Sequence, residues 1–214
     1  EGGIRSFVEF IHQRRGLEAL HEDVIYMKGD SGDNVAEVAM QYNDSYNELL
    51  LSFANNINTG EGGTHEDGFK QALTRVLNAY ARKNNLLKDS DKNLSGEDCR
   101  EGLTAIISVK LREPQFEGQT KGKLGNTEMR QVVSAIVTDK LTTYFEENPQ
   151  VARTIIEKAI TASRAAEAAR KAREATRRKS PLEGVGLPSK LKDCSERNNE
   201  RTELFIVEGD SAGG

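Results

Sequence analysis

The residues with the clearest chemical potential are two carboxylates near the end of the chain, Glu208 and Asp210. They follow a short apolar run, 203–207, that is typical of a buried strand, and glycines lie beside them. Ligands of open α/β sheets sit beyond the carboxyl ends of strands, and glycine allows a metal or substrate to approach the backbone closely. Paired acids without a neighbouring base suit a hard divalent cation and phosphate chemistry. A Gly-rich turn with two solvated acids is the alternative interpretation.

A second candidate is a basic segment within an acidic protein. Residues 153–179 contain nine basic and three acidic residues, a net charge of +6, although the whole chain has a formal net charge of −4. Arg170, Arg173 and Arg177 have the spacing i, i+3, i+7, which places them on one face of a helix. A solvated helix face, or a linker helix stabilised by Glu–Lys and Glu–Arg pairs, would explain part of this composition. The excess of charge favours contact with phosphates.

The histidines and cysteines offer weaker candidates. His65, Glu66 and Asp67 are adjacent and could hold a metal or act in acid–base chemistry, but we favour a capping role for His65 in the first turn of a helix. Cys99 and Cys194 lack a Cys-x-x-Cys spacing and a nearby histidine, so we interpret both as structural. Two cysteines in 214 residues do not make a disulfide framework, which favours a reduced, cytoplasmic context.

The elements that must position these residues alternate between strands and helices, which predicts an α/β fold. Helical periodicity is present in four segments: 4–11, 65–82, 129–144 and 149–178. The alternation of strands is present in four others: 23–28, 35–42, 48–54 and 103–111. Turn residues between the first three strands predict an antiparallel meander, and Thr64 is expected to cap the helix that follows.

Composition excludes several classes of protein. Charged residues make up 30% of the chain and aromatic residues 6%, and no stretch approaches the ~20 apolar residues of a membrane span. No secretory signal peptide opens the sequence, and no Gly-x-x-x-x-Gly-Lys-Ser/Thr phosphate loop is present. We therefore expect a soluble protein, and not a membrane protein, a secreted mini-domain or a zinc finger.

Six segments together resemble the B subunits of bacterial type IIA topoisomerases. They are GGTHEDGF (62–69), SGEDCREGL (95–103), QFEGQTK (115–121), AARKAR (168–173), TRRK (176–179) and EGDSAGG (208–214). The resemblance spans essentially all 214 residues in the right order, and LPSKLKDC (187–194) is more similar to DNA gyrase than to topoisomerase IV. It implies a transducer domain over 1–176, a linker over 177–201, and the first strand and acidic loop of a truncated Toprim domain over 202–214.

The resemblance also implies a fold. The transducer would resemble ribosomal protein S5 domain 2, with a mixed sheet of about four strands, two helices on one face and a long C-terminal connecting helix. A left-handed βαβ crossover, an exception to the usual handedness, belongs to that fold.

Roles for individual residues follow from the same resemblance. Gln119 and Lys121 would contact the γ-phosphate of ATP, which is bound mainly by an ATPase domain upstream of residue 1. Glu208 would be catalytic in DNA cleavage and would bind Mg²⁺, with Asp210 as a second, weaker ligand and further ligands absent from this chain. The residues expected to contact DNA are Lys70, Arg170, Arg173 and Arg177.

The implied function is ATP-dependent passage of one DNA duplex through another, with negative supercoiling. The implied partners are double-stranded DNA, the ATPase domain of the same chain, and the A subunit in a heterotetramer of two A and two B subunits. We expect the fragment alone to be inactive. Three alternatives remain: a topoisomerase IV B subunit that decatenates DNA, a non-enzymatic nucleic-acid or partner-binding module built on the basic helix, and an independent metal-dependent phosphotransferase. The absence of a second metal-ligand cluster argues against the phosphotransferase.

Overall fold

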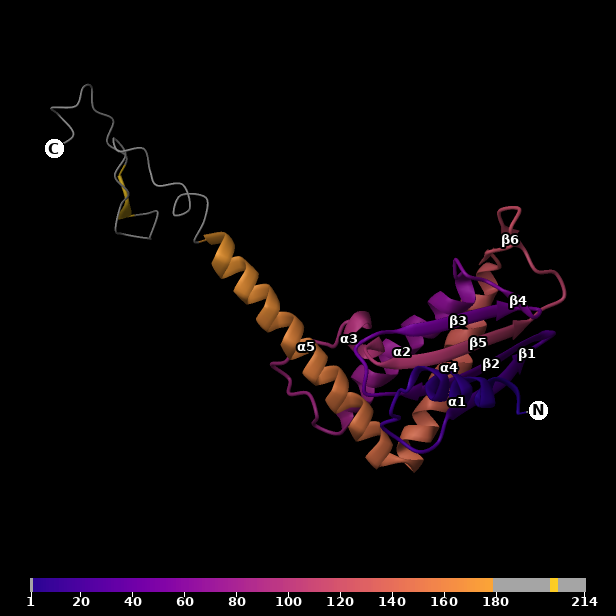
Figure 1. The fold of residues 1–214 in the computed structure, drawn as a ribbon, viewed down its shortest axis with the longest axis horizontal. Helices are drawn as coiled ribbons and strands as arrows, with labels where there is room; N and C mark the ends of the chain where they lie inside the picture. Colours follow the sequence, from indigo (N-terminus) through magenta and orange to yellow (C-terminus); the bar gives the residue numbers. More distant parts are fainter. Residues whose placement is uncertain (1, 179–200, 204–214) are drawn as a thin grey trace, which may run out of the picture. The chain divides into compact units, whose positions relative to one another are not determined.

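A five-stranded mixed sheet lies at the centre of the fold (Figure 1). The structure is a computed structural model, and it describes residues 2–178 and 201–203. The strands, in the spatial order β1-β2-β5-β3-β4, are β1 (Ile25–Ser31), β2 (Asn34–Tyr42), β5 (Leu103–Lys110), β3 (Leu49–Ala54) and β4 (Ile57–Asn58). A separate two-stranded sheet consists of β6 (Phe116–Glu117) and β7 (Lys123–Leu124). The helices are α1 (Gly3–Arg15), α2 (Thr64–Lys83), α3 (Gly96–Arg100), α4 (Thr127–Glu147) and α5 (Pro149–Arg178).

The pairing of the strands differs from the predicted meander. β1 and β2 are antiparallel neighbours as expected, with Ile25 opposite Met40, but β3 does not pair with β2. β5 lies between them, antiparallel to β2 and parallel to β3. Residues 103–107 are all buried, which suits a central strand covered on both faces, and this explains why β5 and not β3 takes that position. A parallel β3–β5 pair needs a crossover, which α2 provides.

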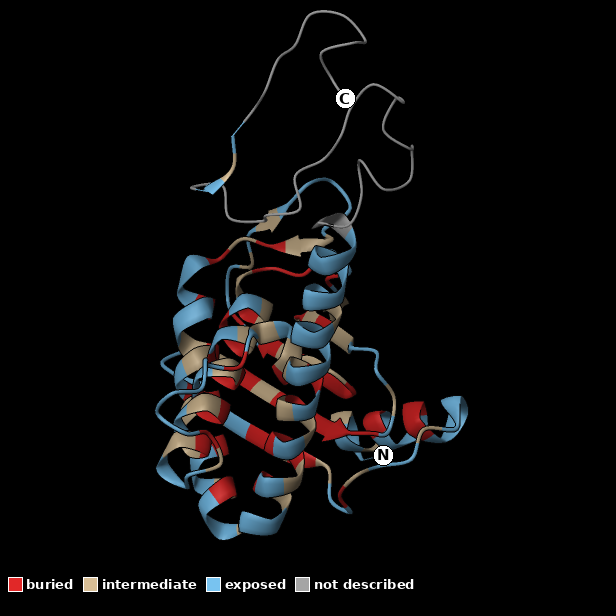
Figure 2. Cartoon of the chain, turned by 90° about the vertical axis from the view of Figure 1, so that its left-hand side faces the viewer, coloured by how far each residue is buried: buried red, intermediate tan, exposed pale blue. Residues whose placement is uncertain are grey.

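Two helices cover one face of the sheet, as expected, and a third covers part of the other face, which we did not predict. α2 and α4 cover one face (Figures 1 and 2), and both contribute to the main core, whose members include Phe69, Leu73 and Val137. α1 covers part of the opposite face, where its Val8 and Ile11 pack against Ala39 and Ile106. The sheet has apolar residues on both faces, and α1 removes part of the second apolar face from water.

Close approach of α2 and α4 depends on a glycine. A Cβ atom on Gly68 would overlap the backbone carbonyl of Arg130, so no larger residue fits there without moving a helix. Side chains then join the two helices at their surface, where Arg75 donates to the hydroxyls of Ser134 (3.0 Å) and Thr138 (2.7 Å). The β6–β7 hairpin is bonded to the residues before both helices, so the position of α4 relative to α2 also fixes the base of this hairpin.

The long helix α5 begins and ends where the sequence predicts, at Pro149 and Arg178. Its first half is packed, with Ala152, Ile155, Ile156 and Ala159 buried. From Ala165 to Thr176 every side chain is exposed or only partly buried. The chain divides at this point into a unit over Glu1–Arg164 and a second unit over Ala165–Gly214. Within the described residues, no helix is long and apolar enough to cross a membrane.

Candidate functional site

The segment that carries Gln119 and Lys121 forms a short hairpin. β6 and β7 are antiparallel, with Phe116 opposite Leu124, and Figure 1 shows this hairpin extending from one end of the main sheet. Two-residue strands contain no periodicity, so the sequence could not reveal them. Gln119, Thr120 and Lys121 lie at the tip and are exposed.

The backbone at the hairpin tip is held in a tight turn. Gly118 and Lys121 both have left-handed backbone conformations, with φ of 78° and 53°, and the amide of Lys121 donates to the carbonyl of Gly118 (3.4 Å). Lys123, in β7, forms an ion pair with Glu117 (2.8 Å). In the part of the chain that the structure describes, the Lys121 ammonium forms no such pair. The hairpin therefore presents one uncompensated cation to solvent.

The hairpin is fixed at its base to the Gly-rich segment before α2. The amide of Glu61 donates to Gly122 (2.9 Å), and the amide of Leu124 donates to Gly62 (3.1 Å). Gly63 forms a parallel bridge with Leu124, has a φ of 143°, and is so close that a Cβ atom there would overlap the Leu124 backbone. Only glycine fits this contact, which explains the Gly62-Gly63 pair in the sequence.

Thr64 does not cap α2, contrary to our prediction. Gly63 occupies the N-cap position, and the Thr64 hydroxyl donates to the backbone carbonyl of Asn126 at the start of α4. Asn126 itself is buried and has its side chain directed to the hairpin. Neither role has a local sequence signal, because the Thr64 bond joins residues 62 positions apart and the Asn126 side chain reaches residues 11 and 13 positions before it.

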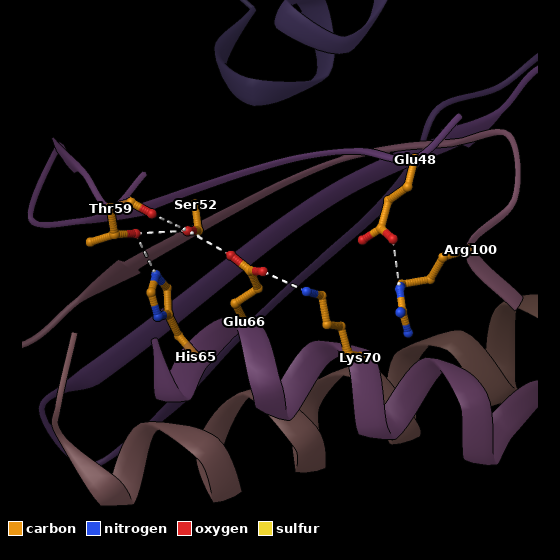
Figure 3. Close-up of polar contacts among 7 residues, drawn as sticks. All are labelled: Glu48, Ser52, Thr59, His65, Glu66, Lys70 and Arg100. Atoms are coloured by element: carbon orange, nitrogen blue, oxygen red, sulfur yellow. Dashed lines mark hydrogen bonds and ion pairs between the residues drawn. The ribbon is translucent and has the colours of Figure 1, made fainter. Parts of the chain in front are cut away.

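The capping role expected for His65 is also wrong. His65 is fully buried, and its Nε2 atom lies 3.1 Å from the Thr59 hydroxyl (Figure 3). Burial is the main cause that lowers the pKa of His65 to about 4, so the ring is neutral at neutral pH. Its neighbour Glu66 is engaged elsewhere, and none of the described residues form a group of three or more ligands that could hold a metal ion.

A chain of polar contacts leads from the Gly-rich segment to Lys70 (Figure 3). The Ser52 hydroxyl lies 2.7 Å from that of Thr59 and 3.1 Å from the Glu66 carboxylate. The second oxygen of Glu66 forms an ion pair with Lys70 (2.7 Å). Glu66 thus neutralises the first of the residues that we expected to contact DNA.

Lys70 lies in a cationic groove of about 720 Å³ along α2. Three arginines line this groove with it, Arg75, Arg82 and Arg100, and no carboxylate is among its lining residues. Arg100 is paired with Glu48 (2.9 Å), whereas Arg82 donates only to neutral oxygens, including that of Asn93 (2.7 Å). We did not identify these arginines from the sequence, although the i, i+7 spacing of Arg75 and Arg82 was a usable signal. The groove carries net positive charge and suits an anionic ligand.

The basic half of α5 is partly self-neutralised. Arg170 pairs with Glu174 (2.6 Å) and Lys171 pairs with Glu167 (2.9 Å), both with i, i+4 spacing. Arg173 is exposed. Arg177 lies in the last turn of α5, and its side chain is outside the described part of the structure. These pairs account for part of the charge run, as the linker-helix alternative proposed, and they leave other cations available.

Of the remaining candidate residues, the structure describes only Cys99. Cys99 is fully buried, and burial raises the pKa of its thiol to about 12, which supports a structural role. Glu208, Asp210 and Cys194 lie outside the described residues, as do most of the linker and the strand predicted over 203–207.

Comparisons with known proteins agree on one family. A family model described as DNA gyrase B matches residues 3–175. The B subunit of DNA gyrase from Clostridium acetobutylicum is 60% identical over 215 aligned positions, which cover 100% of this chain and 33% of that protein. Its counterpart from Halalkalibacterium halodurans is 59% identical over 214 positions, with the same coverage. The chain therefore spans about a third of the length of these relatives.

Solved structures show the same relationship. The 43K ATPase domain of Thermus thermophilus gyrase B, in complex with an aminocoumarin, superposes with a TM-score of 0.75 and 42% identity. That superposition covers 81% of this chain and 46% of the other. The topoisomerase IV ATP-binding domain of Francisella tularensis, in complex with a small-molecule inhibitor, has a TM-score of 0.66 and 28% identity over 77% of this chain and 43% of the other.

Proposed function

The chain belongs to the DNA gyrase B family, and on that premise we propose that it couples the ATP state of a gyrase B protein to the passage of DNA. The complete reaction is the ATP-dependent passage of one duplex through another, with the introduction of negative supercoils. In this proposal the chain completes neither ATP hydrolysis nor DNA cleavage alone. It transmits the nucleotide state of the ATPase site to the site of DNA cleavage.

The hairpin tip is the observation on which this proposal depends. Lys121 is exposed, its backbone is fixed by a turn, and the hairpin base is bonded to the segment before α2. An ammonium group with three donors is a suitable partner for a terminal phosphate, and Gln119 can donate a further hydrogen bond beside it. These residues offer nothing to the base or sugar of a nucleotide, so most of the ATP would be bound by the ATPase domain of the same protein.

Coupling requires that the nucleotide interact differently with two states of the protein. A bound γ-phosphate would hold Lys121, and through it the hairpin and residues 61–63. After hydrolysis and phosphate release, that interaction would be lost. The amide of Gly62 donates to the carbonyl of Thr59, and the side chains of Thr59, Ser52 and Glu66 lead on to Lys70. These contacts would connect the nucleotide to the cationic groove.

Double-stranded DNA is the proposed ligand of the cationic surfaces. The groove around Lys70 and the exposed arginines of α5, Arg170, Arg173 and Arg177, would contact phosphates without reading sequence. Glu208 would act in DNA cleavage and hold Mg²⁺ with Asp210 and ligands from elsewhere in the full-length protein, and the gyrase A subunit would be the partner. Support for gyrase over topoisomerase IV comes from the match to the DNA gyrase B family model and from gyrase B relatives that are 60% and 59% identical.

The proposal is tested by replacing Lys121 in the full-length B subunit, assembled with the A subunit. Loss of one charge-stabilising donor typically costs about 10²–10³ in rate, so Lys121→Ala should lose ATP hydrolysis and supercoiling together. ATP-independent DNA cleavage should persist, because the Glu208 site is unchanged. Steady-state ATPase and cleavage are measured on the same preparation.

Lys123→Ala is the matched control, because Lys123 lies in the same hairpin but is already paired with Glu117. It should leave the ATPase rate within about threefold of wild type, as expected for loss of a surface ion pair. If Lys121→Ala behaved in the same way, Lys121 would be an ordinary surface lysine and the proposal would lose its main support.

A further inference from the structure

Asn126 occupies the N-cap position of α4 but does not cap that helix. An asparagine there usually accepts a hydrogen bond from the second or third backbone amide of the helix. No such bond is present, and the side chain is directed to the segment that leads into β6. Its Oδ1 atom accepts from the amide of Gln115 (2.6 Å), and its Nδ2 atom donates to the carbonyl of Glu113 (3.1 Å) and the carboxylate of Glu128 (2.8 Å).

These bonds close the base of the hairpin that carries Lys121. Glu113 and Gln115 come just before β6, whereas Asn126 follows β7 after a single intervening residue. The amide of that residue, Gly125, donates to the carbonyl of Gln115 (2.7 Å), which completes the closure. Asn126 is only 4% exposed, so water competes little for its hydrogen bonds.

We propose that Asn126 is a positioning residue for Lys121, and this inference rests on the proposed function of Lys121. The amide closes residues 113–115 against residues 125–126 and keeps the tip at a fixed position relative to α4. The carbonyl of Asn126 also accepts from Thr64, so the same residue fixes the hairpin relative to the start of α2. A tip anchored in this way loses less conformational freedom when it meets a phosphate.

The chemistry requires an amide and not merely a helix cap. One planar group must accept from an amide and donate to a carbonyl at the same time, which asparagine does. Aspartate and serine are comparable N-cap residues. Aspartate has no donor for the Glu113 carbonyl and would place a charge beside Glu128, and serine is too short to reproduce both bonds. Asn126→Asp and Asn126→Ser therefore keep a favourable N-cap residue at this position but remove the hydrogen bond to the Glu113 carbonyl.

The experiment uses the full-length B subunit assembled with the A subunit, and measures kcat and KM for ATP hydrolysis. Most of the ATP is bound elsewhere, so loosening the hairpin should reduce kcat and leave KM nearly unchanged. We expect Asn126→Asp and Asn126→Ser to lower kcat about tenfold, which corresponds to the loss of one or two net hydrogen bonds, with KM within about twofold. Hydrogen exchange in peptides over 113–125 should accelerate in both variants.

A double-mutant cycle separates positioning from general stability. If Asn126 acts through Lys121, Asn126→Asp should change the residual rate of Lys121→Ala by less than about twofold. A tenfold loss in that background as well would overturn the inference, as would wild-type kcat or unchanged exchange in Asn126→Asp. Failure of the proposed function is a distinct outcome, because Lys121→Ala alone would then retain its ATPase.

Asn43→Ala is the matched control for loss of a buried amide. Asn43 is 1% exposed, and its side chain bonds to Thr104 (3.2 Å) and to the amide of Ser45 (3.0 Å). It lies beside the first residues of β5, whereas the hairpin follows the last. This variant should lower the midpoint of thermal unfolding but leave kcat within about twofold at temperatures where the protein is folded, since the hydrogen bonds of Asn43 contribute to stability and involve no residue of the hairpin. An equal fall in kcat would assign the Asn126 effect to stability alone.

Discussion

At the scale of single residues, His65 links the fold to pH. The pKa of His65 is lowered from 6.5 to about 4, mainly by burial, so the unfolded chain binds a proton more readily than the folded one. The stability that depends on the neutral ring is therefore fully present above pH 6.5 and is lost as the pH falls toward 4. Burial also lowers the pKa of His12 and His21, which act in the same direction.

We predict that replacing His65 removes part of this pH dependence. Between pH 7 and pH 5, the shift in its pKa accounts for about 2 kcal/mol of unfolding free energy. His65→Asn should be less stable than wild type at pH 7 but should lose about 2 kcal/mol less on acidification, as measured by urea unfolding at both pH values. Ser52→Ala is the control, because it disturbs the same hydrogen-bond network without a titratable group. An unchanged pH dependence in His65→Asn would contradict the assignment.

The roles of single side chains could be predicted from the sequence only where they do not depend on hydrogen-bond partners in other segments. Lys121 has only polar residues and glycines beside it in the sequence, and its exposure agrees with that local composition. Thr64 and His65 resembled capping residues, but their hydroxyl and ring bond to Asn126 and Thr59 instead. Asn126 was missed, since an asparagine before a helix predicts an N-cap and carries no sign that its side chain serves a different segment.

At the scale of elements, predictability follows the strength of the periodic pattern. α5 has the bounds that we predicted, because a first-turn proline, Pro149, and a long helical repeat agree. The strands were also found, but alternation does not specify which strands pair, so the insertion of β5 between β2 and β3 was not foreseen. The two-residue strands β6 and β7 are too short to have any pattern.

For α5 we predict an electrostatic contribution to DNA binding that does not depend on sequence. Each phosphate contact contributes about −0.9 to the slope of log affinity against log salt concentration. Replacing Arg170, Arg173 and Arg177 by Gln in the full-length protein should therefore flatten the slope by roughly 2.7. The Arg170–Glu174 pair does not prevent this, because an exposed ion pair is worth only about 0–1 kcal/mol and exchanges readily for a phosphate.

Arg153→Gln provides the control for the salt experiment. Arg153 lies in the first half of the same helix, is exposed, and makes a long pair with Glu157 (3.7 Å). We expect the slope for this variant to match that of wild type. If the triple replacement also left the slope unchanged, the basic half of α5 would be a solvated spacer, as the alternative interpretation of its composition holds.

At the scale of the whole molecule, the two proposed sites are separated along the sequence. The proposed nucleotide contact, Lys121, belongs to the hairpin before α4, and the proposed cleavage residue, Glu208, follows α5 by thirty residues. Family resemblance could be inferred from the sequence because its motifs span the whole chain, and the matches to DNA gyrase B confirm it. Roles for Glu208 and Asp210 stay predictions, since both lie outside the described residues.

Separation of the centres predicts that each can be inactivated without the other. Glu208→Ala, in the full-length protein assembled with the A subunit, should reduce Mg²⁺-dependent cleavage complexes by at least about a hundredfold, as expected for loss of a metal ligand or acid–base group. ATP hydrolysis should persist, because Lys121 and its hairpin are untouched. This is the reverse of the result expected for Lys121→Ala, and the two variants are compared in the same ATPase and cleavage assays.

Glu203→Ala is the matched carboxylate control for this comparison. Glu203 is exposed and lies at the start of the same predicted strand, without flanking glycines. No metal contact is proposed for it, so loss of this surface carboxylate should leave cleavage near the wild-type level. Normal cleavage by Glu208→Ala would remove the assignment of Glu208. Loss of ATPase together with cleavage would show instead that the segment after α5 is needed for the whole protein to fold, because no contact with nucleotide is proposed for Glu208.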